Sequence, residues 1–96
     1  MHQPLPAETA QTIALQALAY IASDEDKMAG FLAQTGLSTN ELKDHLTEPA
    51  FLGGVLDFLL SDEKALVAFC EEAGIAPDLP KQARQSLPGG EEVHWT

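Results

Sequence analysis

The sequence predicts an all-α protein, a small bundle of five to six short helices. Strand signals are weak, because valine and isoleucine occur at only three positions each and no segment of five residues alternates apolar and polar side chains. The chain is instead rich in Ala, Leu, Glu and Gln, which favour helices. Its 96 residues, 45% of them apolar, suffice for one domain with a modest core.

The first helix is expected over residues 7–22. Two prolines keep residues 1–6 extended as an arm, and Glu8 lies in the first turn, where a carboxylate stabilises the helix dipole. Between 13 and 22 the only strongly polar residue is Gln16. Because this helix lacks a polar half, it must lie at the centre of the fold or be covered by a second chain.

A second helix is expected to begin at Ser23 as its N-cap and to end at Gly36, which can adopt a left-handed conformation. Acidic residues occupy its first turn, and Met28, Phe31 and Leu32 share its buried face.

A short third helix is expected from Ser38 to about Leu46. Ser38 and Glu41 have the spacing of a capping box, in which each side chain accepts a hydrogen bond from the backbone N–H of the other residue. The helix ends before Pro49, because the residue preceding a proline avoids helical dihedrals.

The second half of the chain predicts three further helices. Pro49 begins the fourth, Ser61 is expected to cap the fifth, which ends at Gly74, and Asp78 is expected to cap a last helix that runs to about Gln85. The buried faces of the fourth and fifth helices are expected to be formed by Phe51, Leu52, Val55, Leu56, Leu59, Leu66, Phe69 and Cys70.

An internal repeat accompanies this order of helices. A shift of 38 residues aligns the stretch 18–37 with a later one without a gap. The aligned positions include Ser23 with Ser61, Asp24 with Asp62, Phe31 with Phe69 and Gly36 with Gly74. We therefore predict two similar three-helix units, about 7–46 and 49–87, which form a single domain because neither can bury its apolar face alone. A two-fold arrangement and a solenoid-like translation both satisfy this pattern.

Charge and hydropathy narrow the classes of function. Fifteen acidic residues against five basic ones give a formal net charge of −10. This charge argues against binding to nucleic acid or anionic membranes, and a charged partner is expected to be basic. The longest apolar stretch, 51–60, is far shorter than the roughly 20 residues that cross a bilayer. With no secretory signal at its N-terminus, the chain is expected to be soluble and cytoplasmic.

No catalytic, cofactor-binding or metal site is predicted. The acids at 24–26 and 62–63 lie at helix starts, where carboxylates have a structural role, and counting from Asp24 does not give a calcium-binding loop. His45 is expected on a solvated helix face. Cys70 is the only cysteine, which excludes an intramolecular disulfide and a cysteine-based zinc site, and we expect it to be a small core residue. The chain is therefore expected not to be an enzyme.

One side of the fourth predicted helix consists of small residues and one acid, Ala50, Gly53, Gly54 and Asp57. A glycine inside a helix costs about 1 kcal/mol relative to alanine, so two adjacent glycines need a reason. The first interpretation is close packing against another helix, with Asp57 as a polar anchor at its edge. The alternative is an exposed face.

The acidic C-terminal tail, 88–96, follows a Pro-Gly-Gly break and is expected to be flexible. It contains the only tryptophan, Trp95, which belongs either to a short docking motif or to a segment that folds back on an apolar groove. Together with the small-residue side of the fourth helix, Trp95 is a candidate interaction residue.

Three pieces of the chain, ALQALAYIA at 14–22, FLAQTGL at 31–37 and EPAFLGGVLDFLLSDE at 48–63, resemble a small alphaproteobacterial family, domain of unknown function 3572. The resemblance covers roughly 8–90 and is most specific over 49–63. It implies a bacterial cytoplasmic protein. The family has no assigned activity, cofactor or catalytic residue, so the resemblance implies no site.

These observations together predict a non-enzymatic protein–protein interaction module or a small homo-oligomer, such as a homodimer, that binds through apolar helix surface. The alternative is an acidic regulator that binds a basic protein in place of nucleic acid. That alternative requires the carboxylates to gather on one face, whereas the sequence distributes them among helix starts.

Overall fold

A computed structural model describes residues 5–87 of the chain, and every regular element in this range is a helix. The predicted all-α bundle is therefore confirmed. The elements are α1 (Ala7–Ala22), α2 (Glu25–Thr35), α3 (Thr39–Leu42), the 3-10 helix η1 (Lys43–His45), α4 (Pro49–Leu60), α5 (Glu63–Ala73) and α6 (Leu79–Gln85).

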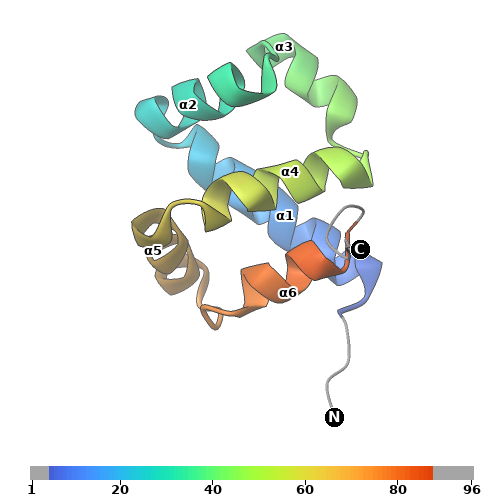
Figure 1. Cartoon of the computed structure of the whole chain (residues 1–96), viewed down its shortest axis with the longest axis vertical. Helices are drawn as coiled ribbons and strands as arrows, with labels where there is room; N and C mark the ends of the chain where they lie inside the picture. Colours follow the sequence, from blue (N-terminus) through green and yellow to red (C-terminus); the bar gives the residue numbers. More distant parts are fainter. Residues whose placement is uncertain (1–4, 88–96) are drawn as a thin grey trace, which may run out of the picture.

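Helix α1 lies at the centre of the molecule. In Figure 1 it crosses behind α4, with α2 and α3 on one side and α5 and α6 on the other. It packs against α4, α6 and α2. Its buried residues are Ala10, Ile13, Ala14, Ala17, Leu18 and Ile21. The central position accounts for the buried side of α1, but Leu15, Gln16 and Ala19 remain exposed, so that a second chain covers this side stays a prediction.

The core is formed where α1, α4 and α6 pack on one another. The predicted apolar face of α4 is buried here except for Phe51, which is partly buried, and α6 packs against both α4 and α1. The buried contributions from α4 and from the C-terminal segment with α6 are Leu52, Val55, Leu56, Leu59, Pro80, Ala83 and Leu87.

Aromatic packing joins α2 to α4. Phe31, 1% exposed, lies edge-on to Phe51 and Phe58, with ring centroids 5.9 and 5.4 Å away. Edge-to-face pairs at such distances are stabilising beyond the apolar area they bury. The predicted buried face of α2 is thus confirmed, with Met28 and Leu32 partly buried beside Phe31.

The helix boundaries in the two halves are related by the predicted shift. The bounds of α2, 25–35, become those of α5, 63–73, when 38 is added. Both helices end at a glycine in the left-handed region, Gly36 at φ 76° and Gly74 at φ 72°. These C-caps were predicted. That the two halves are copies of one duplicated unit stays a prediction.

The predicted N-caps of α2 and α5 were wrong by one residue. Asp24 and Asp62 are the N-caps, and their carboxylates accept hydrogen bonds from backbone N–H groups of the first turn. Ser23 and Ser61 instead end the preceding helices. Each donates its hydroxyl proton to the carbonyl oxygen three residues earlier, at 2.7 Å. The hydroxyls are therefore engaged with α1 and α4.

The third elements of the two halves differ. The predicted capping box is present, since the Ser38 backbone N–H donates to Glu41 Oε1 at 2.8 Å and the Glu41 N–H donates to Ser38 Oγ at 3.3 Å. The helix it begins is shorter than expected and tightens into η1 after Leu42. Asp78 precedes α6 but caps no backbone N–H; its carboxylate accepts from the Gln82 side chain at 3.3 Å.

The ends of the chain are described only in part. Leu5, within the expected arm 1–6, packs partly buried against the core. The acidic tail 88–96, with Trp95, lies outside the described residues. Among residues 5–87, no helix is both long and apolar enough to span a bilayer.

Candidate functional site

The small-residue side of α4 is divided between core and surface. Gly53 is buried, whereas Ala50 is exposed and Gly54 is half-buried. Within the part of the chain that the structure describes, a Cβ atom built on Gly54 would meet nothing within 4 Å. The close-packing interpretation is therefore wrong at Gly54. That this side binds a partner stays a prediction.

Asp57, expected to be a polar anchor, contacts a helix of its own chain. Arg84 Nε donates to Asp57 Oδ1 at 2.6 Å, and the Arg84 side chain is only 15% exposed. A second group of the same guanidinium, Nη1, donates to the Leu87 carbonyl oxygen at 3.5 Å. Asp57 thus joins α4 to α6.

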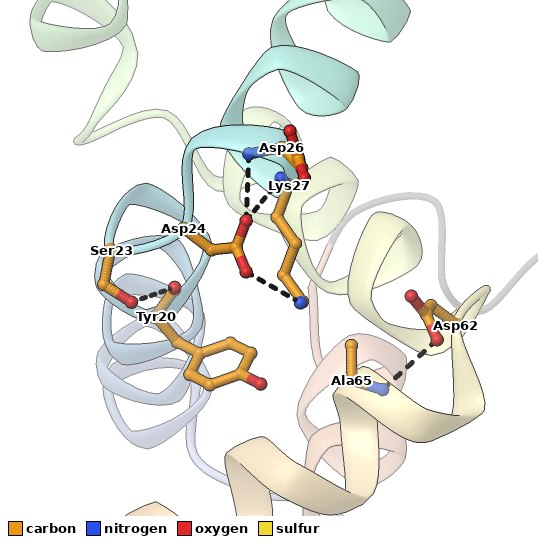
Figure 2. Close-up of polar contacts among 7 residues, drawn as sticks. All are labelled: Tyr20, Ser23, Asp24, Asp26, Lys27, Asp62 and Ala65. Atoms are coloured by element: carbon orange, nitrogen blue, oxygen red, sulfur yellow. Dashed lines mark hydrogen bonds and ion pairs between the residues drawn. The ribbon is translucent and has the colours of Figure 1, made fainter.

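The acids at the start of α2 form a compact network with one lysine (Figure 2). Asp24 Oδ1 accepts from the backbone N–H groups of Asp26 at 2.9 Å and Lys27 at 3.1 Å, and Oδ2 pairs with Lys27 Nζ at 3.3 Å. The backbone hydrogen bond from Lys27, followed by its ammonium, lowers the pKa of Asp24. The same carboxylate raises the pKa of Lys27.

Lys27 also faces the start of α5. Figure 2 shows its side chain extending from α2 into the space between Tyr20 and the first turn of α5. Its Nζ lies 5.9 Å from the centroid of the Tyr20 ring, a cation–π distance. Across this space, Asp62 caps α5 by accepting from the Ala65 N–H at 3.2 Å.

A hollow of about 330 Å³ opens between the two capped helix starts. Its lining residues are Ile21, Asp26, Lys27, Phe58, Leu59, Asp62 and Ala65. No group of three or more His, Cys, Asp or Glu residues among positions 5–87 could hold a metal ion. Asp24 and Asp62 bind backbone N–H groups, so the acids at the two helix starts have the structural role that their position predicts.

A second hollow, of about 300 Å³, lies between α1 and α5, and we call it the α1–α5 groove. It is lined by Gln16, Ala19, Tyr20, Ser23, Phe69, Glu72 and Ala73. The rings of Tyr20 and Phe69 pack together at its base, with centroids 5.6 Å apart and planes inclined by 58°. The short side chains of Ala19 and Ala73 are exposed beside them, Tyr20 is partly buried, and Phe69, which is 3% exposed, lies beneath.

The α1–α5 groove continues an uncharged strip along α1. Thr12, Leu15, Gln16 and Ala19 are exposed on this helix, and Leu15 retains 41% of its surface. The low polarity of α1 is visible in the sequence, whereas the groove is not. The α5 residues that complete it lie about 50 positions further along the chain, and only the folded structure brings them to α1.

The comparison with known proteins gives a family and no function. A model of the family described as Protein of unknown function (DUF3572) matches residues 7–90. The chain belongs to the DUF3572 family. The expected resemblance is thereby confirmed over nearly the expected range. No curated protein and no solved structure matches the chain significantly.

The remaining reactive groups of this DUF3572 protein are engaged in its structure. Cys70 is 2% exposed, and burial, followed by the nearby Asp78 charge, raises the pKa of its thiol. It is the small core residue that was predicted. His45 is half-buried and does not lie on a fully solvated face as expected. Its ring lies against Phe51, and Nδ1 is 2.8 Å from Glu48 Oε1, a contact that raises the pKa of His45.

Proposed function

We propose that this DUF3572 protein is a non-enzymatic protein–protein interaction module of the bacterial cytoplasm, and that it binds its partner through the α1–α5 groove. The observation that carries the proposal is the hollow itself, in which the partly buried Tyr20 packs on the buried Phe69 beside the short, exposed side chains of Ala19 and Ala73. Concave apolar surface of this kind accepts the anchor side chains of a protein partner.

The dimensions of the groove support a short segment of protein as the occupant. From Gln16 to Ser23 it follows α1 for about two helical turns, roughly 10 Å. Its volume of about 300 Å³ is at the lower end of the range for ligand sites. Leu15, one turn before Ala19, extends the apolar surface beyond the groove.

The non-enzymatic part of the proposal is supported by how the ionisable groups are used. Cys70 is buried as a neutral thiol, and Asp24 and Asp62 cap helices. Among the described residues we find no nucleophile, base and orienting group in one cavity. The use of these two acids as caps also disfavours the alternative of an acidic regulator that imitates nucleic acid.

A competing surface for the same function is the small-residue side of α4, because Ala50 is exposed and no atom of residues 5–87 lies within 4 Å of a Cβ atom built on Gly54. The two surfaces lie on different helices, so single arginine substitutions separate them. Ala19→Arg fills the groove, Ala50→Arg covers the α4 side, and Ala33→Arg adds the same charge at an exposed position of α2 as a control.

Affinity purification with chemical cross-linking from the native cytoplasm tests the proposal with the wild type and these three variants. We expect Ala19→Arg to lose the specific partner, while Ala50→Arg and Ala33→Arg keep it. Circular dichroism verifies that each variant is folded. A partner that survives Ala19→Arg and disappears with Ala50→Arg would show that the α4 side is the binding surface.

A further inference from the structure

The α1–α5 groove is lined by an acid and by no basic residue among those described. Glu72 is the only charged residue that lines it, and none of the described side chains forms an ion pair with Glu72. The exposed Glu71 precedes it on α5. An apolar base with an unpaired acid at its edge suits an occupant that combines apolar and basic side chains.

Exposed acidic residues also lie near the end of the groove at Ser23. The chain passes from Ser23 directly into the first turn of α2, where Glu25 and Asp26 are exposed. The one basic group here, Lys27, is already paired with Asp24 at 3.3 Å. Acids therefore flank the groove on the α5 side and at the C-terminal end of α1.

A second copy of this chain would bring like charges together. Each copy carries a net charge of −10, and a symmetric contact through the groove would bring two surfaces edged by Glu72 and its acidic neighbours together. Because like charges in an interface are unfavourable, charge complementarity favours a basic partner.

The form of the occupant follows from the helices that build the groove. Residues 5–87 contain no strand, so there is no sheet edge here to which an extended peptide could add. The groove follows α1 for about two turns, which matches side chains spaced by three and four residues on a helix.

We infer that the α1–α5 groove binds a basic amphipathic helix of another protein, with apolar side chains on Tyr20 and Ala19 and a lysine or arginine paired with Glu72. This inference rests on the proposed function and specifies the chemistry of the partner.

The probe is a fluorescein-labelled helical peptide of leucine and lysine, about 18 residues or five turns long, with the leucines on one face. Its control is the same peptide with glutamate in place of lysine. Fluorescence anisotropy measures binding to the full chain, and chemical shifts of the ¹⁵N-labelled protein locate it. We expect the lysine peptide alone to bind, with shift changes concentrated at the groove residues.

Matched variants distinguish specific binding of the lysine peptide in the groove from its nonspecific electrostatic attraction to an acidic protein. Ala19→Arg is expected to weaken the lysine peptide by about tenfold or more, and Ala33→Arg, with the same change of charge, to weaken it much less. Glu72→Gln is expected to weaken it by about two- to fivefold, as is usual for the loss of one exposed ion pair. Glu8→Gln, at the far end of α1, is expected to leave the affinity unchanged.

Several results would overturn the inference. These are equal binding of the two peptides, equal effects of Glu72→Gln and Glu8→Gln, or shift changes outside the groove. A wild-type dimer in light scattering that Ala19→Arg converts to a monomer would make a second copy the occupant. A change of Trp95 fluorescence on Ala19→Arg would make the chain's own tail the occupant.

The outcome is separable from that of the proposed function. If the lysine peptide fails to bind while Ala19→Arg still loses the native partner, the groove is a binding site and the partner is not a basic helix. If Ala19→Arg loses no native partner, the proposed function itself fails.

Discussion

The glycine residues between positions 5 and 87 adopt two different backbone conformations. Gly36 and Gly74 have φ values of 76° and 72° and terminate α2 and α5, whereas Gly54 lies inside α4 without a positive φ. A residue with a Cβ atom in the left-handed region costs about 1–2 kcal/mol. We therefore expect Gly36→Ala and Gly74→Ala each to lower the free energy of unfolding by about 1–2 kcal/mol in urea denaturation.

Gly54→Ala is the matched control, with the opposite sign expected. Among residues 5–87, a Cβ atom at Gly54 would meet nothing within 4 Å, and alanine is favoured over glycine inside a helix by about 0.5–1 kcal/mol. The substitution should raise the free energy of unfolding by up to that amount. Destabilisation by Gly54→Ala would show that this side of α4 packs closely after all.

His45 and Glu48 make a contact that depends on pH. Hydrogen bonding to Glu48 raises the pKa of His45 above its ordinary value of 6.5. Because the folded-state pKa is the higher one, the contact stabilises the fold fully below about pH 6.5, and this stabilisation is lost as the pH rises through the folded-state pKa.

An NMR titration of the His45 ring tests this contact. We expect the midpoint to lie above 6.5 in the wild type and to fall in Glu48→Gln, where the carboxylate is replaced by a neutral amide. The difference in thermal stability between the two proteins should also shrink as the pH rises through the wild-type midpoint. An identical midpoint in both proteins would exclude Glu48 as the cause.

At the level of helices, the sequence predicts the existence of the helices and their C-caps better than their N-caps. The bounds of α1 agree with the prediction, and so do Gly36 and Gly74 as C-caps, because breakers and left-handed glycines act locally. The N-caps were misplaced because serine and aspartate stand side by side and both are favourable there. The structure distinguishes them, since Ser23 binds back to α1 and leaves the cap to Asp24.

The cap of α5 can be tested by substituting each of the two adjacent residues. Asp62 accepts from the Ala65 N–H at 3.2 Å, whereas the Ser61 hydroxyl is bound to the Phe58 carbonyl oxygen at 2.7 Å. Asp62→Ala should therefore lower the free energy of unfolding by about 1 kcal/mol in urea denaturation, a typical loss for an N-cap. Ser61→Ala should cost less. The reverse order would restore Ser61 as the cap.

The candidate site was less predictable than the helices. The α1 side of the groove has a signal in the sequence, since between Glu8 and Asp24 the helix carries no charge. Its α5 side, Phe69 and Glu72, follows only from tertiary packing, which no local pattern encodes. The small-residue side of α4 shows the opposite case. The pattern of small residues is present in the sequence, but it does not indicate which face of α4 another helix covers.

For the whole molecule, the arrangement around α1 implies that stability is unevenly distributed. α1, α4 and α6 pack on one another, and α2 is attached through α1 and the aromatic pairs of Phe31. The segment α3–η1 has only one buried residue, Leu42. Local opening requires less free energy where few apolar contacts are lost.

Hydrogen exchange should therefore follow this arrangement. We expect the amides in the middle of α1 and α4, around Ala17 and Leu56, to exchange slowest and only by global unfolding, since both residues are 0% exposed. The amides of α3 and η1 should exchange by local opening, with protection that responds little to mild denaturant. Mass spectrometry of exchanged peptides at several urea concentrations distinguishes the two classes. Slow, denaturant-sensitive exchange of the amides in 39–45 would mean that this segment unfolds together with the core. Stability would then not be concentrated in the helices packed around α1.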